Sequence, residues 1–200
     1  MVCKMKKAEI TRLTILEHAF ELIYTQGYQT TSIDDILART KVTKGAFYYH
    51  FKNKDEMGIA IIHELIKPNF EHYFIKPLVQ EKDPMEALYQ MMHDALLKNK
   101  FLKVEFGCPA SNLTIEMAPW NANFTKALNE LALKWKMCME ICLQKGIEQH
   151  VFRKDIDPEQ VAIFIMSGYW GIRNLGKLVN STKVYKDFLK QFEAYLKSLK

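Results

Sequence analysis

The chain has 200 residues, of which 48% are hydrophobic and 26% charged, and its formal net charge is +5. That length suits one large domain or two small ones, and 8 Gly and 6 Pro are too few for a loop-rich β-sandwich, a collagen-like chain or a low-complexity tail. No apolar run is long enough to cross a bilayer and the first ten residues contain no signal peptide, so we expect a cytoplasmic protein that does not bind a membrane.

Four cysteines stand at positions 3, 108, 138 and 142, without the spacing of a disulfide framework or of paired C-x2-C clusters, so we expect reduced thiols. Cys138 and Cys142 lie one helical turn apart. A soft-metal site needs further ligands, and no His or Cys lies at a recognisable spacing from this pair. We therefore expect buried packing thiols, no metal site and no cofactor.

The excess of positive charge is concentrated near the N-terminus. Residues 1–52 carry eight Lys and Arg against five Asp and Glu, whereas residues 53–200 carry 20 against 18. This asymmetry indicates an N-terminal part that faces a polyanion, attached to a nearly neutral body.

Apolar residues recur at three- and four-residue steps along almost the whole chain, and no period-two stretch bounded by hairpin turns is found. We expect an all-α fold of about nine helices, without a sheet or an internal repeat. The expected helices cover residues 8–25, 33–39, 44–51, a long stretch from 53 or 54 that Pro68 and Pro77 bend or end, 84–103, 109–117, 121–149, 157–178 and 184–199.

Residues 30–55 combine a short helix, a turn and a second short helix, which is the pattern of a helix-turn-helix whose second helix enters the major groove of DNA. Hydroxyl groups and backbone amides at the start of a helix can bind DNA phosphates, and a small residue such as Gly45 lets the backbone approach the groove closely. Lys54 places a cation at the start of the next helix, where it can bind a phosphate. The residues predicted to contact DNA are Thr31, Ser32, Thr43, Lys44, Gly45, Tyr48, Tyr49, His50 and Lys54.

The aromatic residues from Phe47 to Phe51 could instead be core residues of a small helical bundle, since aromatic side chains dominate cores. Successive positions of an α-helix cannot all face inward, however. Phe47 and Phe51, four residues apart, share one face and are expected to be buried. Tyr48, Tyr49 and His50 then point elsewhere, which favours the surface that reads DNA.

The segment TTSIDDILARTKVTKGAFYYHFKNKDEM resembles the N-terminal DNA-binding domain of the TetR family of bacterial transcriptional regulators. The match is nearly position for position from Lys44 to Phe51 and from Lys52 to Lys54. One departure is Thr40-Lys41-Val42, where many members have Ala-Gly-Val, and a residue other than Gly makes a left-handed turn position more costly.

The resemblance implies two domains. Residues 1–54 are then the helix-turn-helix DNA-binding domain and residues 55–200 a helical effector-binding and dimerisation domain. It also implies a homodimer that binds an inverted-repeat operator in double-stranded DNA, acts as a repressor, and is released when a small-molecule or electrophilic effector binds.

The last two helices of the family usually pair with their copies in a four-helix interface. Small and apolar residues recur at helical spacing in both of these helices here, although an internal core seam would give each residue the same pattern. The residues predicted for the dimer interface are Ile163, Ser167, Gly171, Leu175, Phe188, Phe192 and Tyr195.

An effector pocket is expected in the C-terminal domain, where large, flexible and aromatic side chains suit an apolar site with a few polar groups. The alternative is that these side chains form ordinary core. The residues predicted for the pocket are Tyr73, Met92, His93, Cys108, Trp120, Trp135 and Trp170.

Cys108 belongs to the segment FGCPASNL, which resembles a "GC–GNL–E" segment in a TetR subgroup that includes the electrophile-responsive repressor NemR, and Glu116 extends this match. Pro109 suits the first position of a helix, where the free amides and the helix dipole favour a thiolate on the preceding residue. Cys108 is then either a reactive sensor or a buried cap residue beside a noncovalent apolar effector.

Two other functions compete with a DNA-binding regulator. One is an enzyme on an all-helical body, but the chain has no Gly-rich phosphate loop, no HExxH and no nucleophile elbow, so we expect no enzyme. The other is a helical adaptor that retains a vestigial DNA-binding motif.

Overall fold

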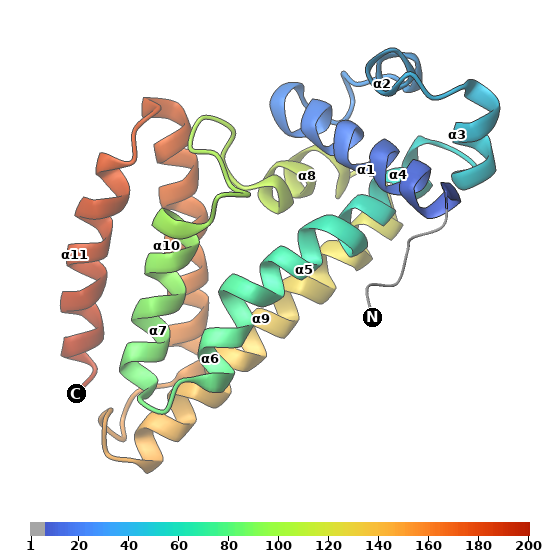
Figure 1. Ribbon diagram of the computed structural model, residues 1–200. Coiled ribbons are helices and arrows are strands. Elements are labelled where there is room, and N and C mark those ends of the chain that lie inside the picture. Colours follow the sequence, from blue (N-terminus) through green and yellow to red (C-terminus); the bar gives the residue numbers. More distant parts are fainter. Residues whose placement is uncertain (1–6) are drawn as a thin grey trace. The chain divides into compact units, whose positions relative to one another are not determined.

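The computed structural model describes residues 7–200 (Figure 1), and Cys3 lies outside this range. In chain order the α-helices and π-helical segments (η) are α1 (Lys7–Gln26), α2 (Ile33–Thr40), α3 (Lys44–His50), α4 (Lys54–Ile61), η1 (Ile62–Ile66), α5 (Lys67–Phe70), η2 (Glu71–Ile75), α6 (Lys76–Gln80), α7 (Pro84–His93), η3 (Asp94–Lys98), α8 (Pro109–Met117), α9 (Ala122–Glu148), α10 (Pro158–Val179) and α11 (Lys183–Ser198).

These residues contain no strand, which confirms the all-α prediction for the described chain. The segments from α4 to α6 follow one another without a break, as do α7 and η3. With each of these two runs counted as one helix, residues 7–200 form nine helices, as the periodicity of the sequence predicts.

The run from α4 to α6 passes both of its prolines and ends only at Gln80, so of the two expected effects of Pro68 and Pro77, bending the helix or ending it, the second does not occur. A π-helical turn precedes each proline: the N–H of Lys67 donates to the carbonyl of Ile62, and that of Lys76 donates to Glu71. Proline lacks an N–H and its ring clashes with the carbonyl four residues earlier. The wider turns let the helix continue across this interruption.

The helix predicted to reach residue 103 ends at Lys98 instead. Asn99 leaves the helical conformation and donates its N–H to the carbonyl of Asp94. The Asn99 and Asn69 side chains exchange two amide hydrogen bonds of 2.9 and 3.1 Å, which fix this helix end against α5. Residues 99–108 then form an irregular connection to α8.

The contacts divide the described chain into two compact units. Unit 1 contains residues 7–67 and 112–128, and unit 2 contains residues 68–111 and 129–200. This division differs from the predicted boundary between residues 54 and 55. The start of the long helical run packs with the N-terminal helices, and a second segment from much later in the chain joins them.

The core of unit 1 is built where α1 meets the short helices that follow it. One face of α1 is buried, and each of α2, α3 and α4 adds apolar side chains to it. The side chains of this core include Ile15, Leu16, Ala19, Ile23, Ile36, Phe47, Phe51, Met57, Ile61 and, from α9, Phe124.

The core of unit 2 contains an aromatic cluster around Trp135 of α9. Its ring lies 4.9 Å from that of Phe74 and 5.5 Å from that of Tyr169, both in edge-on geometry. The helices α10 and α11 lie side by side in opposite directions (Figure 1). They approach closely at Gly176, where a Cβ atom would stand 2.3 Å from the ring of Tyr185.

None of the helices in residues 7–200 combines the length and the apolar character that a membrane span requires. The same residues hold no group of three or more His, Cys, Asp or Glu side chains arranged to bind a metal ion.

Candidate nucleic-acid interface

Two short helices with capped starts form the helix-turn-helix. Ser32 precedes α2, and its hydroxyl accepts the N–H of Asp35 at 3.1 Å while the Asp35 carboxylate accepts the N–H of Ser32 at 2.8 Å. The Ser32 hydroxyl also donates to this carboxylate, and these hydrogen bonds lower the pKa of Asp35. Thr43 caps α3 by accepting the N–H of Ala46 at 3.2 Å. Both caps fix the direction in which each helix starts.

The turn between α2 and α3 has a left-handed residue at Lys41, with φ of 55°. This is the position at which the sequence departs from Gly, and a side chain there costs about 1 kcal/mol. Local hydrogen bonds hold the turn: the N–H of Lys41 donates to Leu37, and the Thr40 hydroxyl donates to the carbonyl of Ile36 at 2.8 Å.

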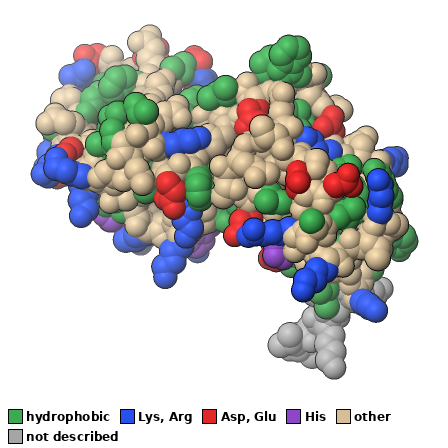
Figure 2. Space-filling view, turned by 90° about the horizontal axis from the view of Figure 1, so that it is seen from above, with side chains coloured by type: hydrophobic (Ala, Val, Ile, Leu, Met, Phe, Trp, Pro, Cys, Tyr) green, Lys and Arg blue, Asp and Glu red, His purple; other side chains and the backbone are tan. Residues whose placement is uncertain are grey.

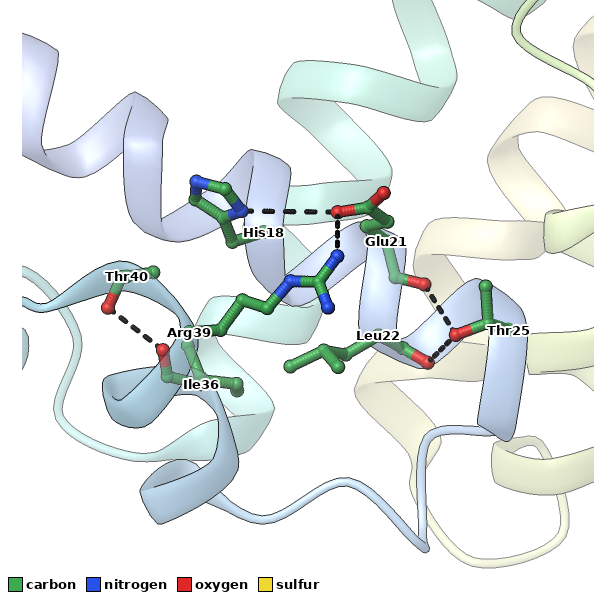
Figure 3. A network of polar contacts seen from close by, with 7 residues as sticks. All are labelled: His18, Glu21, Leu22, Thr25, Ile36, Arg39 and Thr40. Atoms are coloured by element: carbon green, nitrogen blue, oxygen red, sulfur yellow. Dashed lines mark hydrogen bonds and ion pairs between the residues drawn. The ribbon is translucent and has the colours of Figure 1, made fainter.

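An ion pair joins α2 to α1 (Figure 3). The Arg39 guanidinium lies 3.0 Å from the Glu21 carboxylate, and His18 Nδ1 lies 4.0 Å from the same oxygen. These groups are partly exposed, so the pair contributes at most about 1 kcal/mol. Its role is to orient α2 on the rigid α1 helix.

The helix α3 separates its aromatic residues as its periodicity predicts. Phe47 and Phe51 are buried, whereas Tyr48 and Tyr49 are exposed, Tyr49 by 78%. Lys44 and Gly45 are also exposed, and a Cβ atom at Gly45 would have no neighbour within 4 Å. α3 therefore presents a cation, two phenol rings and an open stretch of backbone on one surface.

His50 lies at the edge of this surface and is half-buried. Burial and the nearby Arg12 guanidinium lower the pKa of His50, which keeps its imidazole neutral at pH 7. Arg12 donates to the His50 carbonyl at 3.2 Å, pairs with the Glu64 carboxylate and lies over the ring of Phe51. Arg12 thus fixes the end of α3, a role that the sequence did not indicate.

Two predicted DNA contacts have other partners in the structure. Thr31 is buried, and its hydroxyl donates to the carbonyl of Gly27 at 2.7 Å, so this side chain is not presented to a phosphate. The Lys54 ammonium donates to the carbonyls of Tyr28 and Thr31, both at 2.9 Å, and lies over the Tyr28 ring. Burial lowers the pKa of Lys54, although Asp55 and Glu116 oppose this shift. Most of its donors are used inside unit 1.

The segment 112–128 holds the connection between α1 and α2. Glu116 accepts the backbone N–H groups of Tyr28 and Gln29 at 2.8 and 3.1 Å. The Tyr28 hydroxyl donates to Asp55 at 2.6 Å, and Asn121 donates to the same carboxylate at 2.9 Å. Burial and this hydrogen bond raise the pKa of Tyr28. Sequence reasoning missed these positioning residues because more than 60 residues separate the two segments.

The structure brings only some of the predicted effector residues together. Trp135 and Trp170 lie with their rings 6.3 Å apart, whereas Trp120 is 79% exposed and belongs to unit 1, so it is not part of a pocket in unit 2. Met92 and Cys108 are buried, which is compatible with ordinary core.

The polar residues of the predicted pocket have partners of their own. The Tyr73 hydroxyl donates to the carbonyl of Lys98 at 3.3 Å, and His93 lies 2.8 Å from the Asp94 carboxylate. Unit 2 has a surface hollow of about 490 Å³, which is separate from the predicted pocket. It is lined by Asp83, His150, Val151, Phe152, Arg153, Lys154 and Lys200, and includes none of the residues predicted for the pocket.

The predicted interface residues of α10 are exposed, and those of α11 are largely covered. The outward-facing residues of α10 include Ile163, Ser167, Gly171 and Leu175. The same helix also exposes Phe164 and Leu178, which the prediction omitted. Phe192 is buried in the core of unit 2, so its side chain does not belong to the exposed surface of the single chain. The half-buried Phe188 stacks on it with a ring distance of 5.9 Å, and the Tyr195 ring lies 4.6 Å from Phe164.

Acidic, basic and hydrophobic side chains are interspersed over the face that Figure 2 draws. The modest net charge of +5 is therefore not gathered into one continuous stripe on this face.

Comparisons with known proteins agree with this geometry. The family model "Bacterial regulatory proteins, tetR family" matches residues 15–61, and "Tetracyclin repressor-like, C-terminal domain" matches residues 84–192. The first match covers α2 and α3 with most of α1. The second covers most of unit 2 together with the segment 112–128.

Individual known proteins are similar to this chain, some over part of its length and others over nearly all of it. An HTH-type transcriptional regulator from the lacX 3' region of Lactococcus lactis subsp. lactis is 36% identical over 121 residues, which span 60% of this chain and 62% of that protein. The HTH-type transcriptional repressor DhaR of Mycobacterium sp. (strain GP1) is 23% identical over 94% of this chain and 93% of its own. A TetR-family regulator from Cytophaga hutchinsonii has the same fold, with a TM-score of 0.84, 23% identity and coverage of 99% of this chain and 98% of its own.

Proposed function

Because the chain belongs to the TetR family of DNA-binding transcriptional regulators, we propose that it is a repressor that binds an inverted-repeat operator as a homodimer and leaves it when an effector binds. Its place of action is then the cytoplasm, and we expect no catalytic activity. The repressor mode is supported by the similarity to a named repressor over nearly the full length of both chains.

The observation that carries this proposal is the division of α3 into a buried and an exposed face. Phe47 and Phe51 anchor the helix in unit 1, and Lys44, Tyr48 and Tyr49 face outward from it. A helix in the major groove reads base edges with the residues of its exposed face. Lys44 can donate to guanine or phosphate oxygens, and the tyrosines offer both hydroxyl groups and apolar ring contacts.

The start of each short helix is suited to the phosphates that flank the groove. The exposed hydroxyls of Ser32 and Thr43 lie at helix starts. Free backbone N–H groups attract anions there, and α3 suits them better because its first turn has no acidic residue, whereas that of α2 holds Asp34 and Asp35. Contacts of this kind set the position of a protein on DNA without reading the sequence. The Lys54 ammonium retains one donor beyond its two carbonyl partners and can add one phosphate contact.

Dimerisation is assigned to the exposed apolar surface of α10, with the outer edge of α11. Ile163, Leu175 and Leu178 leave a row of apolar side chains in contact with solvent in the single chain. A second copy related by a two-fold axis would cover the same row and present two α3 helices. The operator is then an inverted repeat with half-sites about one helical turn apart or slightly more.

Unit 2 is the proposed effector-binding part. Cys108 directly precedes α8 and is buried, so it acts either as a cap residue or as a sensor whose sulfur bonds to an electrophile. Treating the parent protein and Cys108→Ser with the same electrophile separates these roles. If both release DNA equally, Cys108 is not the sensor.

A mobility-shift titration with the DNA upstream of the protein's own gene tests the proposal as a whole. We expect a salt-sensitive shift that excess unrelated DNA does not abolish. An enzyme or an adaptor with a vestigial motif gives no shift beyond that of unrelated DNA, and this result would overturn the proposal.

A further inference from the structure

Unit 2 buries one guanidinium group that has no carboxylate partner. Arg12, Arg39 and Arg153 each form an ion pair with an acidic side chain, but Arg173 of α10 does not, although it is only 1% exposed. Its Nη2 atom donates to two main-chain carbonyls, those of Lys103, at 2.9 Å, and of Gly107. Among the described residues its charge therefore has two carbonyl dipoles and the face of the Tyr185 ring as partners, and no carboxylate.

Two buried hydrogen-bond donors beside this charge are unused. Within the described residues neither Nε of Arg173 nor the hydroxyl of Tyr185 has a hydrogen-bond partner. The guanidinium carbon lies 5.4 Å from the centre of the Tyr185 ring, so both donors belong to the same contact between α10 and α11. Burial raises the pKa of Tyr185, Arg173 opposes this shift, and Cys108 and Glu105 add to it, so the hydroxyl keeps its proton at pH 7 and can donate a hydrogen bond.

Burying a cation without an anion, beside hydrogen-bond donors without acceptors, costs free energy of folding. A buried cation normally pairs with an anion, and buried polar atoms normally find partners. Both requirements are met at once by an anion that accepts from Arg173 and Tyr185. The nearest covering segment is the irregular stretch 99–108, which supplies the two carbonyls and is the part that must move to admit a ligand.

We propose that Arg173 and Tyr185 bind the carboxylate group of a small monocarboxylate effector in the core of unit 2. This inference rests on the proposed function, because it names the chemical class of the effector. A carboxylate has the opposite charge to the guanidinium, and its oxygens can accept one hydrogen bond from Nε of Arg173 and one from the Tyr185 hydroxyl, while Nη2 keeps its two carbonyl partners. Tyr169 and Ile172, which precede Arg173 on the same helix, are buried and largely apolar, so the proposed ligand has a short apolar body.

Thermal unfolding with matched probes tests the site. Propionate and benzoate are compared with propionamide and benzamide, which have the same shape without the charge. We expect at least one carboxylate to raise the unfolding temperature of the parent protein, since a ligand of the folded state stabilises it, and we expect its amide to have no effect. No difference between acids and amides overturns the proposal, and Arg173 is then only a brace for residues 103–107.

Three variants identify the residues. Arg173→Met should abolish the effect of the carboxylate, whereas Arg153→Met removes the same charge at a partly exposed position and should preserve it. If Arg173→Met does not fold, Tyr185→Phe decides. It deletes an unpartnered hydroxyl, so the unfolding temperature without ligand should not fall, while carboxylate affinity should fall about tenfold or more. An unchanged affinity in Tyr185→Phe contradicts the assignment.

A mobility shift on the same samples separates this inference from the proposed function. A carboxylate that stabilises the protein through Arg173 supports the site even if the protein binds no specific DNA, in which case the proposed function alone fails. Specific DNA binding without any carboxylate effect on unfolding retains the regulator and overturns the site.

Discussion

Glu116 is the residue that most directly ties the segment 112–128 to the helix-turn-helix. Its carboxylate accepts two successive backbone N–H groups at the turn after α1, where Gly27 adopts a φ of 101° and the chain changes direction toward α2. Hydrogen bonds to a charged acceptor are stronger than neutral ones. The position of α2 therefore depends on one side chain nearly 90 residues away in the sequence.

Replacing this carboxylate should destabilise unit 1. Glu116→Ala leaves the N–H groups of Tyr28 and Gln29 without their partner, and we expect the free energy of unfolding to fall by about 1–3 kcal/mol. Glu116→Gln keeps an acceptor oxygen and should lose less. Chemical denaturation measures both, with Glu130→Ala on the exposed side of α9 as the control. Equal stability of all three variants would contradict the role given to Glu116.

The two faces of α3 should respond oppositely to truncation. Tyr49→Ala removes an exposed ring and should leave the unfolding temperature unchanged while it weakens operator binding by about 1–3 kcal/mol. Phe47→Ala should cost about 3–5 kcal/mol of stability, because it opens a cavity in unit 1. Circular dichroism and mobility-shift titrations measure the two effects. Loss of stability in Tyr49→Ala with unchanged DNA affinity would exclude a surface role.

Single residues were predictable where helical periodicity alone decides their environment. The periodicity placed Phe47 inward and Tyr49 outward, and the structure agrees. It could not show that Thr31 and Lys54 would turn inward. Lys54 finds the carbonyl of Tyr28 26 residues earlier, and only the tertiary fold brings the two together.

The sequence predicted which segments form helices well, and it predicted the residues at which these helices end less well. The apolar repeat predicts nine helices, because the formation of each helix depends on the local spacing of apolar residues and on capping residues. The continuation through Pro68 and Pro77 was not predictable from the general rule that proline breaks a helix. The π-helical turns that allow it have no sequence pattern of their own, since they add one residue to a turn without changing the type of side chain.

The packing of α10 on α11 gives a matched pair of glycine variants. A Cβ atom at Gly176 would stand 2.3 Å from the Tyr185 ring, whereas one at Gly171 would have no neighbour within 4 Å. Gly176→Ala should therefore lower the unfolding temperature. Gly171→Ala meets no atom of its own chain, and Ala has the better helix propensity, so it should not lower the stability of the monomer, which a dilution series separates from any effect on the proposed dimer. Similar effects of both substitutions would mean that the two helices do not approach closely at Gly176.

At the scale of the molecule, the sequence predicted two functional parts, and the compact units of the structure divide the chain differently from that predicted boundary. A boundary after residue 54 follows the end of the recognisable motif. The structure adds residues 55–67 and 112–128 to unit 1 because Asp55, Glu116 and Asn121 bond to it or within it. A motif in the sequence marks the residues that share a local pattern, and it carries no information on distant segments that pack against them.

The dimer proposal also belongs to this scale. Leu175→Glu places a charge in the exposed apolar row of α10 and should convert the dimer to a monomer, since a charge at the centre of an interface is costly. Specific operator binding should fall with it. Lys177→Glu, on an exposed position of the same helix, is the control. A dimer that persists in sedimentation of Leu175→Glu would assign dimerisation to another surface.

The composition of unit 1 from two stretches of chain has a practical consequence for exchanging operator specificity between relatives. A graft that transfers only the residues up to 54 separates Tyr28 from Asp55, from Phe124, whose ring lies 5.0 Å away, and from Gly58, which has no Cβ to clash with the Tyr28 ring. Such a hybrid inherits the DNA-reading residues but loses the support beneath them. We expect a graft that moves residues 7–67 together with 112–128 to keep these contacts.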